Sequence, residues 1–301
     1  MIVVIGEILI DMFQDYQRIG GAPFNFAFHL IKLGFPVRFF TRVGNDRNGR
    51  RIIDLLEKNG FNQADIQIDS RHPTGTVRVD LDEQGIPHFD IGANVAYDHL
   101  DLNIADVLDG GVADMIYFGT LLQRTDSGRR QVQRFLSRSA NSATHFCDIN
   151  MRPPHVNVHA VGESLHRADL LKVNEAELAE IQHAFDGPPG KGEVMPWLME
   201  TFKIKAVALT RGSRGSTFYS RDGQISNHAV PGAPIVDTVG AGDGYAAILA
   251  AGWMRQIPWE ETLRQASCFA ARICGIEGAV PDDESFYDDF RPLRKGDADG
   301  R

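Results

Sequence analysis

Residues 237–245, with the sequence DTVGAGDGY, lead through a glycine-rich turn into an apolar run that continues to Met254. The composition of that run is typical of a helix, so the chain changes here from a turn to a helix N-terminus. The first N–H groups of a helix have no partner within it and can hold a phosphate group. We call residues 237–242 the glycine turn. Together with the apolar run, this turn predicts a helix that begins with an anion-binding site.

Asp243 lies in or beside the first turn of that helix. A carboxylate in this position would face the charge of any oligophosphate held by the turn, which is costly unless the acid takes part in the reaction. Its chemical use would be to accept the proton of a hydroxyl that attacks a terminal phosphorus atom. A second interpretation stays open, because an Asp in the first turn also interacts favourably with the helix dipole, by about 0.3–1 kcal/mol.

The composition is that of an ordinary globular protein. Of 301 residues, 43% are hydrophobic and 24% are charged, and the formal net charge is −9. This acidic balance and the lack of a basic run argue against nucleic acid and anionic membranes as partners. The three cysteines show neither metal-ligand spacing nor the even count of a disulfide framework. Without a signal peptide or an apolar run of about 18 residues, we expect a cytoplasmic protein.

Short apolar runs alternate with longer amphipathic segments along the chain. The predicted strands are Ile2–Ile5, Val37–Thr41, Met115–Phe118, His145–Ile149, Leu170–Val173 and Ala206–Thr210. The predicted helices are Phe24–Leu33, Arg50–Lys58, Gly128–Ser139, Glu175–Phe185, Ala241–Met254 and Glu260–Ile276. Such alternation is typical of βαβ units, so we expect an α/β fold with a doubly wound, mainly parallel sheet flanked by helices. We expect residues 1–301 to form a single domain with a disordered tail at 294–301.

One segment interrupts this alternation. Residues 76–81 alternate with period two, a turn follows at 82–85, and Phe89 and Ile91 share one face of the next run. This pattern predicts a β-hairpin. A hairpin inserted into an α/β chain does not easily join a parallel sheet, so we expect a small lid formed by about residues 12–20 and 72–96. An antiparallel edge to the main sheet is the alternative.

A second glycine motif lies near the N-terminus, where Gly20 and Gly21 precede a predicted helix. Paired glycines let a ligand approach the backbone closely. Asn25 would project from the first turn of that helix, where its amide offers a donor and an acceptor to a sugar hydroxyl. Asp11 closes the first strand segment at the end where open α/β sheets bind ligands. For the glycine pair, a purely structural turn is the alternative.

Taken together, these stretches resemble a known family. Residues 20–25 (GGAPFN), 42–49 (RVGNDRNG) and 237–243 match, in order and spacing, the two signatures of the ribokinase-like (PfkB) carbohydrate kinases. The opening segment 6–11 (GEILID) and residues 94–98 (NVAYD) resemble fructokinase-type members of that family. The resemblance extends over nearly the whole chain.

The resemblance implies roles for the matching residues. Asp243 matches the catalytic base, and Gly240, Ala241 and Gly242 match the turn whose amides form an anion hole for the transferred phosphoryl group. The implied sugar-binding residues are Asp11, Gly21, Asn25 and Arg152. The implied nucleotide-binding residues are Asn174, Thr210, Gly212, Gly215, Gly240 and Gly242. Glu177 matches a position that acts on Mg²⁺ through water, and Asp237 is a candidate ligand of a monovalent cation.

Some of these matches have a structural alternative. The spacing of Asn174 and Glu177 is also that of a capping box at a helix N-terminus. Thr210 and Gly212 also suit a plain exit from a strand into a turn, and Arg152 also suits an exposed loop.

The resemblance implies ATP-dependent phosphorylation of a sugar hydroxyl, with ATP, Mg²⁺ and, as a candidate activator, K⁺. We expect D-fructose as substrate, with 2-keto-3-deoxygluconate, ribose and nucleosides as alternatives, and the lid is a candidate homodimer contact. A non-catalytic sugar or nucleotide sensor on the same fold is an alternative of another class. No G-x-G-x-x-G follows the first strand and no G-x-x-x-x-G-K-[ST] is present, which argues against a nicotinamide-dependent oxidoreductase and a P-loop kinase.

Overall fold

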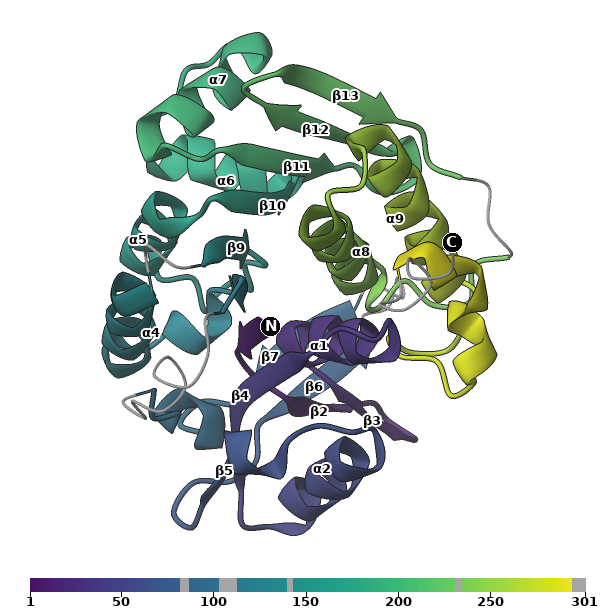
Figure 1. Ribbon diagram of the computed structural model, residues 1–301. Helices are drawn as coiled ribbons and strands as arrows, with labels where there is room; N and C mark the ends of the chain where they lie inside the picture. Colours follow the sequence, from purple (N-terminus) through teal and green to yellow (C-terminus); the bar gives the residue numbers. More distant parts are fainter. Residues whose placement is uncertain (82–86, 103–112, 140–142, 231–233, 294–301) are drawn as a thin grey trace.

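The computed structural model describes residues 1–81, 87–102, 113–139, 143–230 and 234–293 (Figure 1). The tail at 294–301 and the turn expected at 82–85 lie outside these residues. None of the described helices is both long and apolar enough to cross a membrane.

The described part of the chain contains a large sheet of nine strands. They are β1 (Ile2–Ile5), β4 (Val37–Gly44), β5 (Ile66–Asp69), β8 (Met115–Phe118), β9 (Thr144–Asp148), β10 (Leu170–Asn174), β11 (Ala206–Thr210), β12 (Ser216–Ser220) and β13 (Gly223–Asn227). Their order in the sheet is β13-β12-β11-β10-β9-β8-β1-β4-β5. Neighbouring strands from β11 to β5 are parallel, and β12 and β13 add an antiparallel hairpin at one edge. The predicted doubly wound, mainly parallel sheet is confirmed.

Strand β1 lies inside this sheet and supplies two separate apolar cores. Ile2 and Val4 pack into one core, and Val3 and Ile5 pack into the other, because successive side chains of a strand point to opposite faces. The first core includes residues of α1 (Ala22–Lys32), α2 (Arg47–Lys58), α8 (Ala241–Arg255) and α9 (Trp259–Ile273). The second includes residues of α4 (Asp126–Ser139), α5 (Val158–Arg167), α6 (Glu175–Ala184) and α7 (Lys191–Phe202). Helices therefore cover both faces of the sheet (Figure 1).

A small sheet, separate from the large one, contains β3 (Gln17–Gly20), β2 (Leu9–Met12), β6 (Thr76–Leu81) and β7 (Pro87–Ile91), in that order. Strands β6 and β7 form the predicted antiparallel hairpin. The hairpin pairs with β2 and not with the large sheet, so the alternative of an edge to the main sheet is wrong. Strands β2 and β3, which the pattern of the sequence did not predict, make this sheet four-stranded.

The order of strands reverses at β1, and this reversal positions the site. From β1 the chain continues to β4 and β5 on one side, and it later returns to β8 and β9 on the other side. Ligands of open α/β sheets bind at the carboxyl ends of the strands beside such a reversal. Helices α1 and α8 pack against each other on this part of the sheet (Figure 1), so the N-termini of both can contribute to a single site.

Candidate active site

The glycine turn forms the N-terminus of α8, as the sequence predicts. Gly240 is the N-cap residue and has a φ of 78°, in the left-handed region that favours glycine. A Cβ atom at Gly240 would also lie 2.3 Å from the Cβ of Ala279. Gly242, in the first turn, is exposed. The Ala241 N–H donates to the Thr238 carbonyl oxygen at 3.4 Å. The first N–H groups of the helix, among them that of the exposed Gly242, have no partner within the helix, as an anion hole requires.

Asp243, in the first turn of α8, lies next to the first turn of α1. Its Oδ2 accepts a hydrogen bond of 2.7 Å from Nδ2 of Asn25, which is 3% exposed. Burial raises the pKa of Asp243, and the negative charge of Asp148 raises it further. The Asn25 hydrogen bond and the positive charges of Lys172 and Arg152 oppose this rise. The two predicted motifs, 218 residues apart, therefore meet at the candidate base.

A buried ion pair lies behind the glycine turn. Lys172 Nζ, from β10, donates to both carboxylate oxygens of Asp148, at 2.9 and 3.0 Å, and the Tyr117 hydroxyl donates to the same carboxylate at 3.2 Å. Burial alone would lower the pKa of Lys172, but the charges of Asp148 and Glu177 raise it, so the ammonium stays charged. Lys172 Nζ lies 3.5 Å from the point where a Cβ of Gly242 would be. The fixed positive charge of Lys172 thus lies next to Gly242 of the glycine turn.

The residues expected to bind sugar come from the small sheet, the N-terminus of α1 and the loop after β9. Contrary to the prediction from the sequence, Asp11 does not close a strand of the large sheet, because β1 ends before it and Asp11 belongs to β2 of the small sheet. Its Oδ2 occupies space left free by Gly20, where a Cβ would lie only 2.4 Å away. Burial raises the pKa of Asp11 to about 6, against the positive charge of Arg152. Gly21 is the N-cap of α1 with a φ of 117°, and a Cβ there would lie 2.7 Å from the Glu7 carbonyl oxygen. Arg152 is exposed on the loop after β9.

Asn174 and Glu177 form the capping box of α6 that the sequence allowed as an alternative. The Glu177 N–H donates to Asn174 Oδ1 and the Asn174 N–H donates to Glu177 Oε2, both at 2.9 Å. The other oxygen of Glu177 accepts the N–H of Met151 at 3.1 Å. Glu177 is 7% exposed, and burial raises its pKa. Each carboxylate oxygen keeps one further lone pair, so the capping box does not prevent a bond from metal-bound water.

A cavity of about 780 Å³, which we call the inner cavity, adjoins the glycine turn. Its walls include the nucleotide-binding candidates Thr210, Gly212 and Gly215 together with Ala241 and Gly242. At its base, the Tyr245 hydroxyl donates to Ser216 Oγ at 2.7 Å. This size lies within the roughly 300–1,000 Å³ that is typical of small-molecule sites.

Asp237, the candidate ligand of a monovalent cation, accepts three hydrogen bonds from residues that the structure describes. Its Oδ1 accepts the N–H of Val239 at 3.0 Å, and its Oδ2 accepts the N–H of Gly278 at 3.1 Å. The third donor is Arg18 Nη1, at 3.0 Å from Oδ2. Arg18 belongs to strand β3 of the small sheet.

Comparison with known proteins shows the family to which this chain belongs. The family model described as pfkB family carbohydrate kinase matches residues 1–285. The chain belongs to this family. It is therefore a sugar kinase, as the resemblance of its motifs implies.

The relatives of this pfkB-family kinase include fructokinases. The fructokinase of Salmonella typhimurium is 28% identical over 285 residues, which cover 90% of this chain and 91% of the relative. The structure of the Xylella fastidiosa fructokinase with bound ATP has a TM-score of 0.82 at 21% identity, over 96% of this chain and 98% of that one. A double mutant of the Vibrio cholerae fructokinase, solved in fructose-, ADP- and potassium-bound form, has a TM-score of 0.81 at 22% identity, over 95% and 97%.

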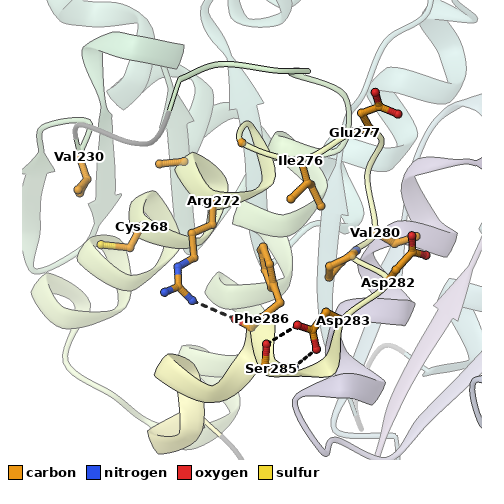
Figure 2. A pocket seen from close by; sticks show the side chains of 13 residues that line it. Val230, Cys268, Arg272, Ile276, Glu277, Val280, Asp282, Asp283, Ser285 and Phe286 are labelled. Atoms are coloured by element: carbon orange, nitrogen blue, oxygen red, sulfur yellow. Dashed lines mark hydrogen bonds between the residues drawn. The ribbon is translucent and has the colours of Figure 1, made fainter.

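A second cavity of this pfkB-family kinase, the outer cavity, has a volume of about 890 Å³ and lies between α9 and the segment 275–286 (Figure 2). Arg272 Nη1 donates to the Phe286 carbonyl oxygen at 3.0 Å along one wall. The carboxylates of Glu277, Asp282 and Asp283 also border this cavity. No motif in the sequence predicted it.

Sequence reasoning missed two positively charged side chains of this pfkB-family kinase, those of Lys172 and Arg18. A lysine within the apolar strand β10 is a recognisable signal, because lysine is almost never fully buried unless it is paired. Arg18 gives no such signal. Its partners Asp237 and Glu277 are 219 and 259 residues away in the chain, so only the fold reveals its role.

Proposed function

We propose that this sugar kinase transfers the terminal phosphoryl group of ATP to a hydroxyl of D-fructose. The observation that supports this most directly is the 2.7 Å hydrogen bond between Asn25 and Asp243. It joins the motif expected to bind sugar to the turn expected to bind the transferred phosphoryl group. Fructose is favoured over other sugars by the fructokinases among the relatives.

In this proposal Asp243 accepts the proton of the attacking hydroxyl. The buried surroundings that raise its pKa also make it a better proton acceptor than an exposed Asp. Asn25 orients the carboxylate through its side-chain amide. The transition state of phosphoryl transfer is loose, so the base needs only moderate strength and correct position.

Positive charge around the glycine turn would offset the charge that develops on the phosphoryl oxygens. The N–H groups of residues 240–242 point from the N-terminus of α8, where the helix dipole adds a partial positive charge. Lys172, held by Asp148, lies behind Gly242, and Arg152 influences the titration of both Asp11 and Asp243. Fixed dipoles and charges of this kind are a large part of catalysis in acyl and phosphoryl transfer.

The nucleotide would occupy the inner cavity. Gly212 leaves open space where a side chain would otherwise project, and the cavity leads from Thr210 to the N-terminus of α8. Glu177, with Asn174 beside it, would hold Mg²⁺ through water, which suits a cation that keeps several of its own waters. Bound Mg²⁺ would neutralise phosphate charge.

The small sheet would act as a lid. It carries Asp11 and shares no strand pairing with the large sheet, so its movement would open and close the sugar site. Closure would exclude water, which competes with the sugar as phosphoryl acceptor. Strands β3 and β7 are the edges of this sheet, and an edge strand can pair with a second copy of the chain. A homodimer through the lid is therefore part of the proposal, and analytical ultracentrifugation would test it.

The direct test is ADP formation from ATP and Mg²⁺ with fructose, ribose, 2-keto-3-deoxygluconate and a nucleoside in parallel. The proposal expects the highest kcat/KM with fructose, and NMR of the product shows which hydroxyl carries the phosphate. Turnover of another sugar at higher kcat/KM would replace fructose as the substrate. Binding of sugar and nucleotide by calorimetry, without turnover of any of them, would favour the sensor.

A further inference from the structure

Arg18 connects the small sheet to the glycine turn. Its Nη1 donates to Asp237 Oδ2 and its Nη2 donates to Glu277 Oε2, both at 3.0 Å. The side chains of Arg18 and Asp237 are 26% and 21% exposed, whereas Glu277 is 77% exposed. Glu277 lies at the rim of the outer cavity (Figure 2). The ion pair of Arg18 with Asp237 is therefore better shielded from water than the ion pair with Glu277, and it is the stronger of the two.

The position of the guanidinium is fixed by aromatic packing on its own sheet. Arg18 lies over the ring of Tyr16, 4.6 Å from its centroid, and 5.8 Å from the centroid of Phe13. The two rings stack on each other at 4.4 Å. Arginine loses little further freedom when it is already stacked in this way, so the guanidinium is in place before Asp237 meets it.

Asp237 in turn determines the shape of the glycine turn. Its carboxylate accepts the N–H of Val239, within the turn, and the N–H of Gly278, on the loop that follows α9. The Cα and Cβ of Ala279 on that loop lie against Gly240, the N-cap of α8. A change in the charge balance at Asp237 would therefore shift the N–H groups that face the transferred phosphoryl group.

The residues at Asp237 do not fit a monovalent cation while Arg18 is in place. A cation bound to Oδ2 would lie beside a guanidinium that already neutralises the carboxylate, and two like charges at about 4 Å repel each other even at the protein surface. The other oxygen, Oδ1, accepts the N–H of Val239 and keeps one lone pair, but a cation bound there would still lie close to the same guanidinium. The charge that a monovalent cation would supply is thus provided by the chain.

We propose that Arg18 is a positioning residue that replaces a monovalent cation at Asp237, so that this kinase works without K⁺. The glycine turn is then held in its active shape by a side chain of the small sheet. This inference rests on the proposed function, because it concerns the same phosphoryl site. Unlike a freely exchanging ion, Arg18 also makes the shape of the turn depend on the position of the small sheet.

The test compares wild type, Arg18→Ala and Arg18→Lys, with Arg78→Ala, an exposed arginine of β6, as the matched control. Initial rates are measured with saturating sugar in potassium, sodium or tetramethylammonium chloride at equal ionic strength. We expect wild type and Arg78→Ala to be insensitive to the cation. Arg18→Ala should lose about 10²-fold in kcat in tetramethylammonium, the cost of a small misplacement, and regain most of it in potassium. Arg18→Lys should retain activity without potassium.

A melting-temperature series in the same salts gives a readout that needs no turnover. Potassium should raise the Tm of Arg18→Ala, because a ligand that binds the folded state stabilises it, and should leave wild type unchanged relative to tetramethylammonium. A wild type whose kcat requires potassium, or an Arg18→Ala variant that is fully active without it, would overturn the inference. If wild type phosphorylates no sugar in any salt, the proposed function fails, and the Tm series still decides whether Arg18 replaces a cation.

Discussion

At the scale of single residues, Asp243 lies close enough to the acidic residues Glu7, Asp11 and Asp148 to interact with their charges. Its charge raises the pKa values of both Glu7 and Asp11, after the larger effect of their burial. Burial raises its own pKa as well. A group of carboxyls that resist ionisation together is unusual in a merely structural site, and it is a typical property of acid–base sites. Asn25, Lys172 and Arg152 moderate the effect at Asp243.

Asp243→Asn keeps the shape of the side chain but removes its basicity. We expect kcat to fall by about 10²–10⁴-fold, the usual contribution of a positioned general base. ATP binding measured by calorimetry should stay close to that of wild type, because the inner cavity is unchanged. Asp54→Asn, an exposed aspartate of α2, is the matched control and should turn over normally. Wild-type kcat in Asp243→Asn would refute the assignment of the base.

Glu7→Gln tests the pH dependence that burial imposes. Burial raises the pKa of Glu7 to about 7 in the folded protein, from 4.5 for an unperturbed glutamate. The folded state therefore holds this proton more tightly than the unfolded chain, and wild type loses stability as the pH rises from 4.5 through about 7. The glutamine variant lacks this loss.

The difference in unfolding free energy between Glu7→Gln and wild type should therefore grow in favour of the variant across this range. Above about pH 7 this difference should become constant. Its value should be on the order of 3 kcal/mol, because a pKa difference of one unit corresponds to about 1.36 kcal/mol. Urea unfolding at a series of pH values between about 5 and 8 measures the difference. A difference that does not change with pH would contradict the raised pKa.

At the residue scale, contacts between residues that are close in the sequence could be predicted, and contacts between distant residues could not. Gly240 and Asp243 stand in one local motif, and Asn25 in another, so their roles could be inferred from the residues around them. The contact that unites them, and the pairing of Lys172 with Asp148, depends on how strands and helices pack. The capping box of Asn174 and Glu177 is local, and it was foreseen as an alternative for that reason.

At the scale of elements, the turn into α8 is the most constrained feature of the site. Gly240 needs a positive φ and also lies against Ala279. Each requirement alone would favour glycine, and together they leave no room for another residue. Gly240 is thus required for two reasons, one conformational and one steric.

Gly240→Ala should separate these two requirements when it is compared with Gly60→Ala. Gly60 has a similar φ of 81°, and a Cβ there would meet no atom within 4 Å. We expect Gly60→Ala to cost about 1–2 kcal/mol from the left-handed backbone alone. Gly240→Ala should cost about 1–3 kcal/mol more from overpacking against Ala279, and should also lower kcat. Equal unfolding free energies of the two variants in urea would show that Ala279 yields without strain.

Short strands that are apolar and buried could be predicted from the sequence, as could the alternating hairpin of β6 and β7, whereas other strands at or near the sheet edges could not. The bounds of β1, β8 and β11 agree with the predicted ranges, because these strands are short apolar runs buried on both faces. Strands β12 and β13 were missed because serine, asparagine and glutamine interrupt their apolar pattern. Strands β2 and β3 of the small sheet are also short, and polar residues interrupt them, so they lack the continuous apolar run of β1.

At the scale of the whole molecule, the small sheet and the large sheet meet at the site. Asp11 and Arg18 belong to the small sheet, and Asp148, Lys172 and Thr210 belong to the large one. A site assembled from two sheets can respond to a ligand by changing the angle between them. Through the contact between Arg18 and Asp237, such a change in angle would alter the shape of the glycine turn.

Hydrogen exchange would detect such a closure. With fructose and a non-hydrolysable ATP analogue, we expect slower exchange in β2, β3, β6 and β7 than in the free protein, because a closed lid loses contact with water. Strand β13, at the far edge of the large sheet, should not change and serves as an internal control. Unchanged exchange in the small sheet upon binding of both ligands would argue against its role as a lid.

The alternation of β1 between two cores has a consequence for substitutions. Ile2 and Val4 contact the layer that holds α1 and α8, while Val3 and Ile5 contact the layer that holds α4, α5 and α7. None of these last three helices contributes a residue to the site described above, whereas α6, which packs into the same core, carries Glu177. Substitutions on α4, α5 and α7 that keep their buried apolar residues should therefore change turnover less than substitutions on α1, α6 and α8.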